Sequence, residues 1–100
     1  MTIKLFKLVT GEEVIGEFGE AMMHGKGVPS ISLGDQLTKP FQVIEMIQNG
    51  QIMLVLRPYF RGGVCDVLWI KPEHVVQSIN PSEALVDAYR QQVSGIVVAR

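Results

Sequence analysis

The residues with the clearest chemical potential lie in one short stretch, Arg57-Pro58-Tyr59-Phe60-Arg61-Gly62-Gly63. Two arginines flank two aromatic side chains, and a glycine pair that favours a flexible turn follows them. Cationic side chains neutralise the phosphates of a nucleic-acid strand, and aromatic rings give its bases a surface on which to stack. The stretch therefore predicts a contact with single-stranded RNA or DNA.

Two further residues extend this predicted interface. Lys71 and His74 follow the next predicted strand along the chain, and they join the aromatic pair if the two strands are adjacent. The complete predicted nucleic-acid site consists of Arg57, Tyr59, Phe60, Arg61, Lys71 and His74. One alternative stays open, in which the two aromatic residues belong to the core and the arginines form a solvated rim.

The sequence offers no pattern for catalysis or for metal binding. His24 and His74 are the only imidazole bases, and no serine lies in a recognisable nucleophile elbow. Metal spacings such as HxxxH and CxxC are missing, and no glycine-rich phosphate loop precedes a helix. The lone Cys65 excludes an intramolecular disulfide and is typical of a small buried side chain. We expect a protein that is not an enzyme and that needs no cofactor or metal ion.

Composition restricts the class of protein and of partner. The 100 residues fit a single domain, residues 1–100, and 47% of them are hydrophobic while 19% are charged. This apolar excess favours a partner subunit. The formal net charge is −1, so a site for an anionic partner must be local. The sequence has no segment of signal-peptide type and no apolar run near the ~20 residues of a membrane span. We expect a cytoplasmic protein that makes no membrane contact.

The stretch from Lys7 to Phe18 organises the predicted fold. It is a β-hairpin with its turn at Thr10-Gly11, and its strands carry apolar residues on both faces. A strand of this kind is covered on both sides, and a neighbouring subunit is the simplest second cover. Gly16 lies inside the second strand, where a glycine marks a bulge, a bend or the close approach of another backbone. A bent strand early in a small β-rich chain indicates a sheet that curls toward a barrel.

Further strands are predicted to follow, up to about residue 79. The glycines of residues 19–30 indicate a loop, and Asn49-Gly50 indicates a tight hairpin turn. The continuous apolar run from Ile52 to Leu56 is typical of a central strand that is buried on both faces. Residues 64–71 and 74–79 are expected to form the last two strands.

A helix over about residues 81–94 closes the chain. Asn80-Pro81-Ser82-Glu83 predicts its start, with Asn80 as the N-cap and Pro81 at the first helical position. Gly95 is expected to end or weaken it. An apolar stripe at helical spacing indicates a core or subunit contact. The stripe consists of Leu85, Ala88, Tyr89 and Val93.

Two segments resemble the two motifs of the Sm-like superfamily, which includes the LSm proteins and bacterial Hfq. The pattern of the first motif is matched by Leu8, Gly11, Val14, Gly16 and Phe18. The segment from Ile70 to Val75 is similar to the second motif, with Lys71 in place of its basic residue. The chain more specifically resembles small Sm-like proteins of cyanophage type. The resemblance implies a mainly β, five-stranded, strongly bent open barrel of SH3 type, here with a C-terminal helix.

The sequence departs from the Sm-like pattern at three points. The Asp and Asn that bind base and sugar-phosphate in the family have no counterpart between Gly19 and Ser30, and Pro72 replaces the glycine after the basic residue. The usual N-terminal helix is also absent. The resemblance thus implies the fold and ring assembly more strongly than the nucleotide pocket.

The combined prediction is a homo-oligomeric ring of about five to seven subunits, closed by pairing of edge strands. Its expected function is non-catalytic binding of single-stranded nucleic acid, RNA above all, in RNA or DNA processing. Rotational symmetry repeats a weak site along one strand and so raises its effective affinity. The alternative is a structural or protein-interaction ring, such as a phage assembly factor, which binds through its helix face and the Met22-Met23 loop.

Overall fold

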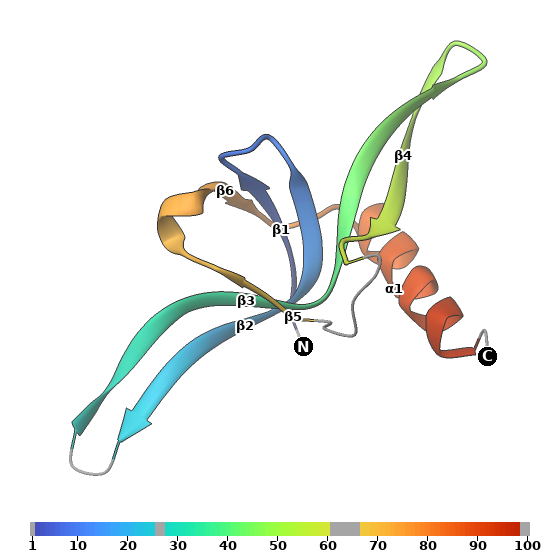
Figure 1. The fold of residues 1–100 in the computed structure, drawn as a ribbon. Helices are drawn as coiled ribbons and strands as arrows, with labels where there is room; N and C mark the ends of the chain where they lie inside the picture. Colours follow the sequence, from blue (N-terminus) through green and yellow to red (C-terminus); the bar gives the residue numbers. More distant parts are fainter. Residues whose placement is uncertain (1, 26–27, 61–66, 99–100) are drawn as a thin grey trace.

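The computed structural model describes residues 2–25, 28–60 and 67–98 (Figure 1). Its elements are β1 (Thr2–Leu8), β2 (Glu13–Gly25), β3 (Val28–Gln48), β4 (Gln51–Pro58), β5 (Val67–Ile70), the 3-10 helix η1 (Pro72–His74), β6 (Val75–Ile79) and α1 (Glu83–Val98). The prediction of a mainly β chain with a C-terminal helix is confirmed. Six strands form the described sheet, one more than predicted, and the sheet does not close.

All strand pairs of the sheet are antiparallel. The strand order is β4-β3-β2-β1-β6, and β5 pairs with β3. β3 pairs with β5 through residues 35–38 and with β4 through residues 41–48, so these two strands follow one another along the same edge of β3. The β2–β3 and β3–β4 hairpins project in opposite directions, and the longest dimension is 59 Å (Figure 1).

The bend predicted at Gly16 is present as a bulge. The register of β2 against β3 shifts at this glycine, where it faces Lys39 and Pro40 of β3. Lys39 takes a positive φ of 52°, as the inserted residue of a bulge can. A Cβ atom on Gly16 would lie 3.0 Å from the Cβ of Leu37. Gly16 is therefore favoured, because a side chain here would force the adjacent part of β3 to shift by a few tenths of an ångström.

Tyr89 of α1 fixes this bulge from outside the sheet. Its hydroxyl donates to the carbonyl oxygens of Lys39 at 2.8 Å and of Thr38 at 3.2 Å. Its buried ring packs edge-on against Phe41, with ring centroids 5.7 Å apart. Burial raises the pKa of the Tyr89 phenol well above its usual value, and the charge of Glu17 raises it further. The helix therefore holds the bend through the carbonyl groups of two residues at the bulge.

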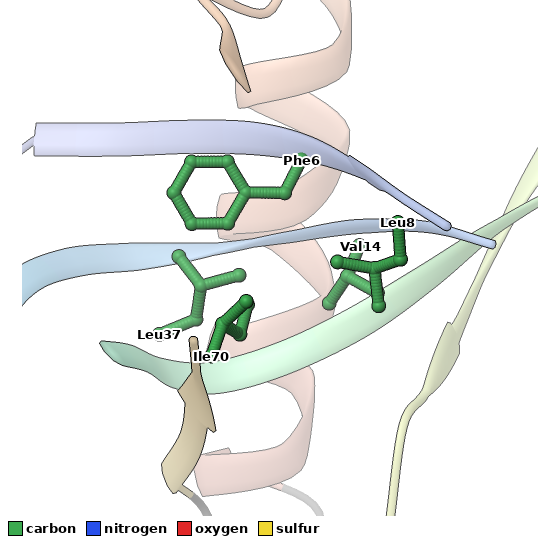
Figure 2. Packing of buried hydrophobic residues seen from close by; sticks show 5 residues of the cluster. All are labelled: Phe6, Leu8, Val14, Leu37 and Ile70. Atoms are coloured by element: carbon green, nitrogen blue, oxygen red, sulfur yellow. The ribbon is translucent and has the colours of Figure 1, made fainter. Parts of the chain in front are cut away.

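Two hydrophobic clusters lie on opposite faces of the sheet. The inner cluster contains Phe6, Leu8, Val14, Leu37 and Ile70, which point toward one another between β1, β2, β3 and β5 (Figure 2). The outer cluster contains Leu5, Ile15, Phe41 and Tyr89, with Leu56, Leu85 and Val93 packed against it. The chain itself thus covers both faces of the first hairpin. The prediction that a neighbouring subunit supplies the second cover was wrong, because α1 occupies that face.

The strand that contains Ile52 to Leu56 is not the buried central strand that the sequence predicted. β4 ends the described strand order, and Ile52 and Leu54 are 68% and 57% exposed. The outer cluster extends only to Leu56 at the base of β4. The apolar run therefore belongs to a two-stranded projection that the other described residues of this chain leave exposed.

Four predicted boundaries also change. Most of residues 19–30 continues β2 and β3 as a paired hairpin instead of a loop, since backbone pairing extends to Gly25 and Val28. Ser82 caps α1 in place of Asn80, because the Leu85 N–H donates to the Ser82 hydroxyl oxygen at 3.3 Å. The helix also continues through Gly95 to Val98. Of the strand predicted over residues 64–71, β5 covers Val67–Ile70, and residues 64–66 and Cys65 lie outside the described part of the chain.

Candidate nucleic-acid interface

Tyr59 lies at the centre of the predicted interface, directly after β4. Its N–H donates to the Pro40 carbonyl oxygen at 3.0 Å, which ties the end of β4 to the bulge in β3. Its hydroxyl donates to Oε1 of Glu12 at 3.2 Å. Burial, followed by the charge and hydrogen bond of Glu12, raises the pKa of the Tyr59 phenol above its ordinary value. Phe60 packs edge-on against it, with ring centroids 5.3 Å apart.

Tyr59 and His74 line one cleft of about 290 Å³, which we call the Tyr59 cleft. The other lining residues are Leu8, Val9, Thr10, Glu12, Leu68, Trp69 and Ile70. They come from the end of β1, the first turn, β5 and η1. A pocket near this volume that combines apolar walls with a few polar groups is typical of a small-ligand or base-sized site.

The 3-10 helix η1 sets the rim of this cleft. The Val9 N–H donates to the carbonyl oxygen of His74 at 2.9 Å, which fastens η1 to the chain just after β1. Lys71 immediately precedes η1 and is exposed, outside the cleft lining. Both Lys71 and His74 therefore lie on the β5 and η1 side of the site.

The predicted arginines are not placed in the cleft lining. Arg57 is exposed on β4, where its backbone partner in β3 is Gln42. Arg61 lies outside the described residues. The structure thus brings together Tyr59, Phe60 and His74, and it leaves Arg57 and Lys71 on the surface nearby in sequence.

Sequence reasoning missed two residues of the cleft. Trp69 lines it and is 62% exposed. The strand period could have identified Trp69 as an exposed aromatic residue, because Leu68 and Ile70 pack on the inner cluster and the residue between them alternates to the solvent side at the edge of the cleft. Glu12 also lines it, from the first turn. Its carboxylate accepts hydrogen bonds from the Tyr59 and Thr10 hydroxyls, both at 3.2 Å.

A second hollow of about 500 Å³ adjoins the cleft and shares Thr10 and Glu12 with it. Three carboxylates, those of Glu12, Glu13 and Glu45, line this Glu12 groove. These negatively charged carboxylates repel phosphate groups, so the Glu12 groove disfavours a nucleic-acid backbone. A nucleic-acid strand bound at the cleft would therefore run along the Lys71 and His74 side. Its base, and not its phosphate, would face Glu12.

The described residues contain no group of three or more His, Cys, Asp or Glu side chains that could hold a metal ion. Within that same part of the chain, every helix is too short or too polar to cross a bilayer. Comparison with known proteins adds no relative: no family model matches the chain, and none of the curated proteins matches it. The chemistry of the site therefore has to be argued from the geometry alone.

Proposed function

We propose that this chain is a non-catalytic binding protein for single-stranded nucleic acid, with RNA as the main ligand, and that it acts in the cytoplasm as a homo-oligomeric, Sm-like ring. One observation carries the proposal. The Tyr59 cleft gathers Tyr59, Trp69 and His74 from three separate segments at a base-sized hollow. Stacking of a base on an aromatic side chain contributes about 1–3 kcal/mol and needs no particular base.

The charges around the cleft determine which side the phosphate of a bound nucleic acid occupies in this proposal. Lys71 and His74 supply positive or neutral groups on one side, and the Glu12 groove supplies negative charge on the other. A phosphate therefore lies against the η1 side. The Glu12 carboxylate only accepts hydrogen bonds, so the edge of the base that faces it must carry N–H donors.

The sheet also supports ring assembly, because strand edges are open. β6 and β4 end the described strand order. An open edge is a template for pairing with another chain, and a head-to-tail contact closes into a ring when the rotation permits. We propose that the outer edge of β6 takes part in the ring contact.

Titration of fluorescent single-stranded oligonucleotides at two salt concentrations tests the binding proposal. Trp69→Ala is expected to weaken binding by about 5- to 100-fold through lost stacking. Lys71→Ala is expected to reduce the salt dependence by about one phosphate contact. Arg90→Ala, on the exposed surface of α1, is the control and should bind as the parent protein does. Absent or salt-independent binding would refute the proposal.

A structural or protein-interaction assembly is the second candidate, and the Glu12 groove favours it because the carboxylates oppose phosphate. The helix face is not available to such a partner as predicted, since Leu85, Tyr89 and Val93 pack on the outer cluster of the same chain. A pull-down distinguishes the two candidates. Recovery of a protein partner that nuclease treatment leaves unchanged supports the assembly role.

A further inference from the structure

The outer edge of β4 lacks the features that normally protect an edge strand. Residues 51–58 pair with β3 in unbroken register, so no bulge twists this edge away. From Ile52 to Leu56 the strand contains neither charge nor proline, and Arg57-Pro58 interrupts it only at its end. Edge strands in monomeric proteins are usually short, charged, bulged or covered. β4 is therefore an edge of the kind that pairs with another strand.

The exposed side chains of the β3–β4 arm, residues 44–48 and 51–55, lie on both faces of the hairpin. Side chains alternate along a strand, so Ile52 and Leu54 share one face while Met53 lies on the other. All three are exposed. A partner that packed on one face would leave the second face in water. A strand that pairs with the edge contacts both faces at once, because its side chains become cross-strand neighbours on each.

We propose that β4 pairs in antiparallel orientation with β4 of a second copy of this chain, about a two-fold axis at Leu54. The apolar run from Ile52 to Leu56 is centred on Leu54. A register with Leu54 opposite its own copy sets Met53 opposite Val55 and Ile52 opposite Leu56, so every pair is apolar. Pro58, which has no N–H to donate, falls outside the paired segment. The strand is thus complementary to itself.

Charge on the arm also favours a second copy over other occupants. Residues 41–56 contain Glu45 and no lysine or arginine, so nothing on the arm attracts phosphate or anionic lipid. The tip, residues 48–51, is Gln-Asn-Gly-Gln, which a bilayer would have to dehydrate. Glu45 lies on β3, one strand away from the proposed contact. In the joined four-stranded sheet the two Glu45 residues are about 14 Å apart by strand spacing, beyond a screening length of about 8 Å.

This contact is isologous and does not depend on the proposed ring. It joins copies in pairs, so it converts a monomer into a dimer or one ring into a pair of rings. The mass of the assembly therefore reports on the two proposals separately.

Light scattering on the size-fractionated full chain at micromolar concentration tests the inference. Leu54→Lys introduces an edge lysine, and we expect it to halve the mass of the assembly. Ile47→Lys is the matched control, because Ile47 lies on the same face of the same arm but on β3, one strand away from the proposed contact, and it should leave the mass unchanged. Circular dichroism establishes that both variants keep the β-rich spectrum.

Each outcome separates the two proposals. If Leu54→Lys halves the mass of the assembly and Ile47→Lys does not, the inference is supported, whether the parent protein is a dimer or a larger assembly. An unchanged mass for Leu54→Lys overturns it even if a ring exists, and equal halving by both variants overturns it in favour of packing through a face. A monomeric parent protein refutes both proposals.

A cross-linking experiment provides a second measurement if Leu54→Lys fails to fold. In a Cys65→Ser background, Leu54→Cys places two thiols opposite one another across the two-fold axis, within the range that a disulfide spans. We expect mild oxidation to yield covalent dimers. Ile47→Cys is the control, and covalent dimers from it at the same rate would overturn the register.

Discussion

The first hairpin, β1–β2, and the β3–β4 arm share a sequence pattern but differ in burial: the side chains of the first are buried, and those of the second are exposed. Both alternate apolar residues onto two faces. In the first hairpin Ile15 and Val14 point to opposite faces and both are fully buried. In the arm, Ile47 is 78% exposed and Ile52 is 68% exposed. The difference is the presence of a second layer, because α1 and the curled sheet cover the first hairpin and neither reaches the tip of the arm.

This comparison shows that apolar residues on both faces of a hairpin do not reveal which segment covers them, or whether the same chain does. A two-stranded hairpin is marginal in water unless another layer packs on it. The first hairpin obtains that layer from the C-terminal helix of the same chain. The arm has an open edge, and a second copy supplies the equivalent cover in our proposal. Four substitutions test how different the two hairpins are.

The largest expected effect is on the covered side. Phe41→Ala removes a buried ring that packs against Tyr89, and we expect it to lower the free energy of unfolding by about 3–5 kcal/mol. Ile47→Ala in the arm should lower it by less than about 0.5 kcal/mol under conditions that keep the chain monomeric. Urea unfolding measures both. Similar losses for the two variants would contradict the contrast between the hairpins.

The bend that lets α1 cover the first hairpin is expected to be sensitive to one methyl group. Gly16→Ala places a Cβ 3.0 Å from the Leu37 Cβ and 3.1 Å from the Thr38 carbonyl oxygen. We expect a loss of about 1–3 kcal/mol from overpacking. Gly19→Ala is the control in the same strand, since its nearest contact is an ordinary 3.5 Å. If both variants unfold at the same urea concentration, close approach at Gly16 is not essential.

Tyr89→Phe tests the polar contact between the helix and the bulge. Loss of the two hydrogen bonds should lower the free energy of unfolding by about 1–2 kcal/mol. The pKa of Tyr89 is raised in the folded state, so the unfolded chain loses its phenolic proton first as pH rises. Stability is therefore complete below pH ~10 and falls above it. Unfolding curves from pH 8 to 11 should show a shallower decline for the Phe variant, and an identical decline would refute the role of Tyr89.

The smallest expected effect concerns the start of the covering helix. Ser82→Ala should lower the free energy of unfolding by about 1 kcal/mol, because the Leu85 N–H loses its capping oxygen. Asn80→Ala should have almost no effect. Thermal unfolding of the pair distinguishes the observed cap from the predicted one, and a larger loss for Asn80→Ala would restore the prediction.

The candidate site was predictable in part. Tyr59 and His74 were identified from aromatic and basic residue types, and they do line one cleft. Trp69 and Glu12 were missed because their roles depend on which segments meet. Glu12 lies at the first turn, and its hydrogen bond to Tyr59 spans 47 residues of sequence. No local pattern predicts a contact of that separation.

The amino-acid sequence by itself determined the mainly β class, the hairpin turn at Asn49-Gly50, the special role of Gly16 and the C-terminal helix. Each of these follows from local rules, because backbone freedom and side-chain period act over a few residues. Only the tertiary structure decided that α1 covers the first hairpin and that β4 ends the sheet. Burial of a face depends on which segment, distant in sequence, packs against it, and only the complete tertiary structure determines that segment.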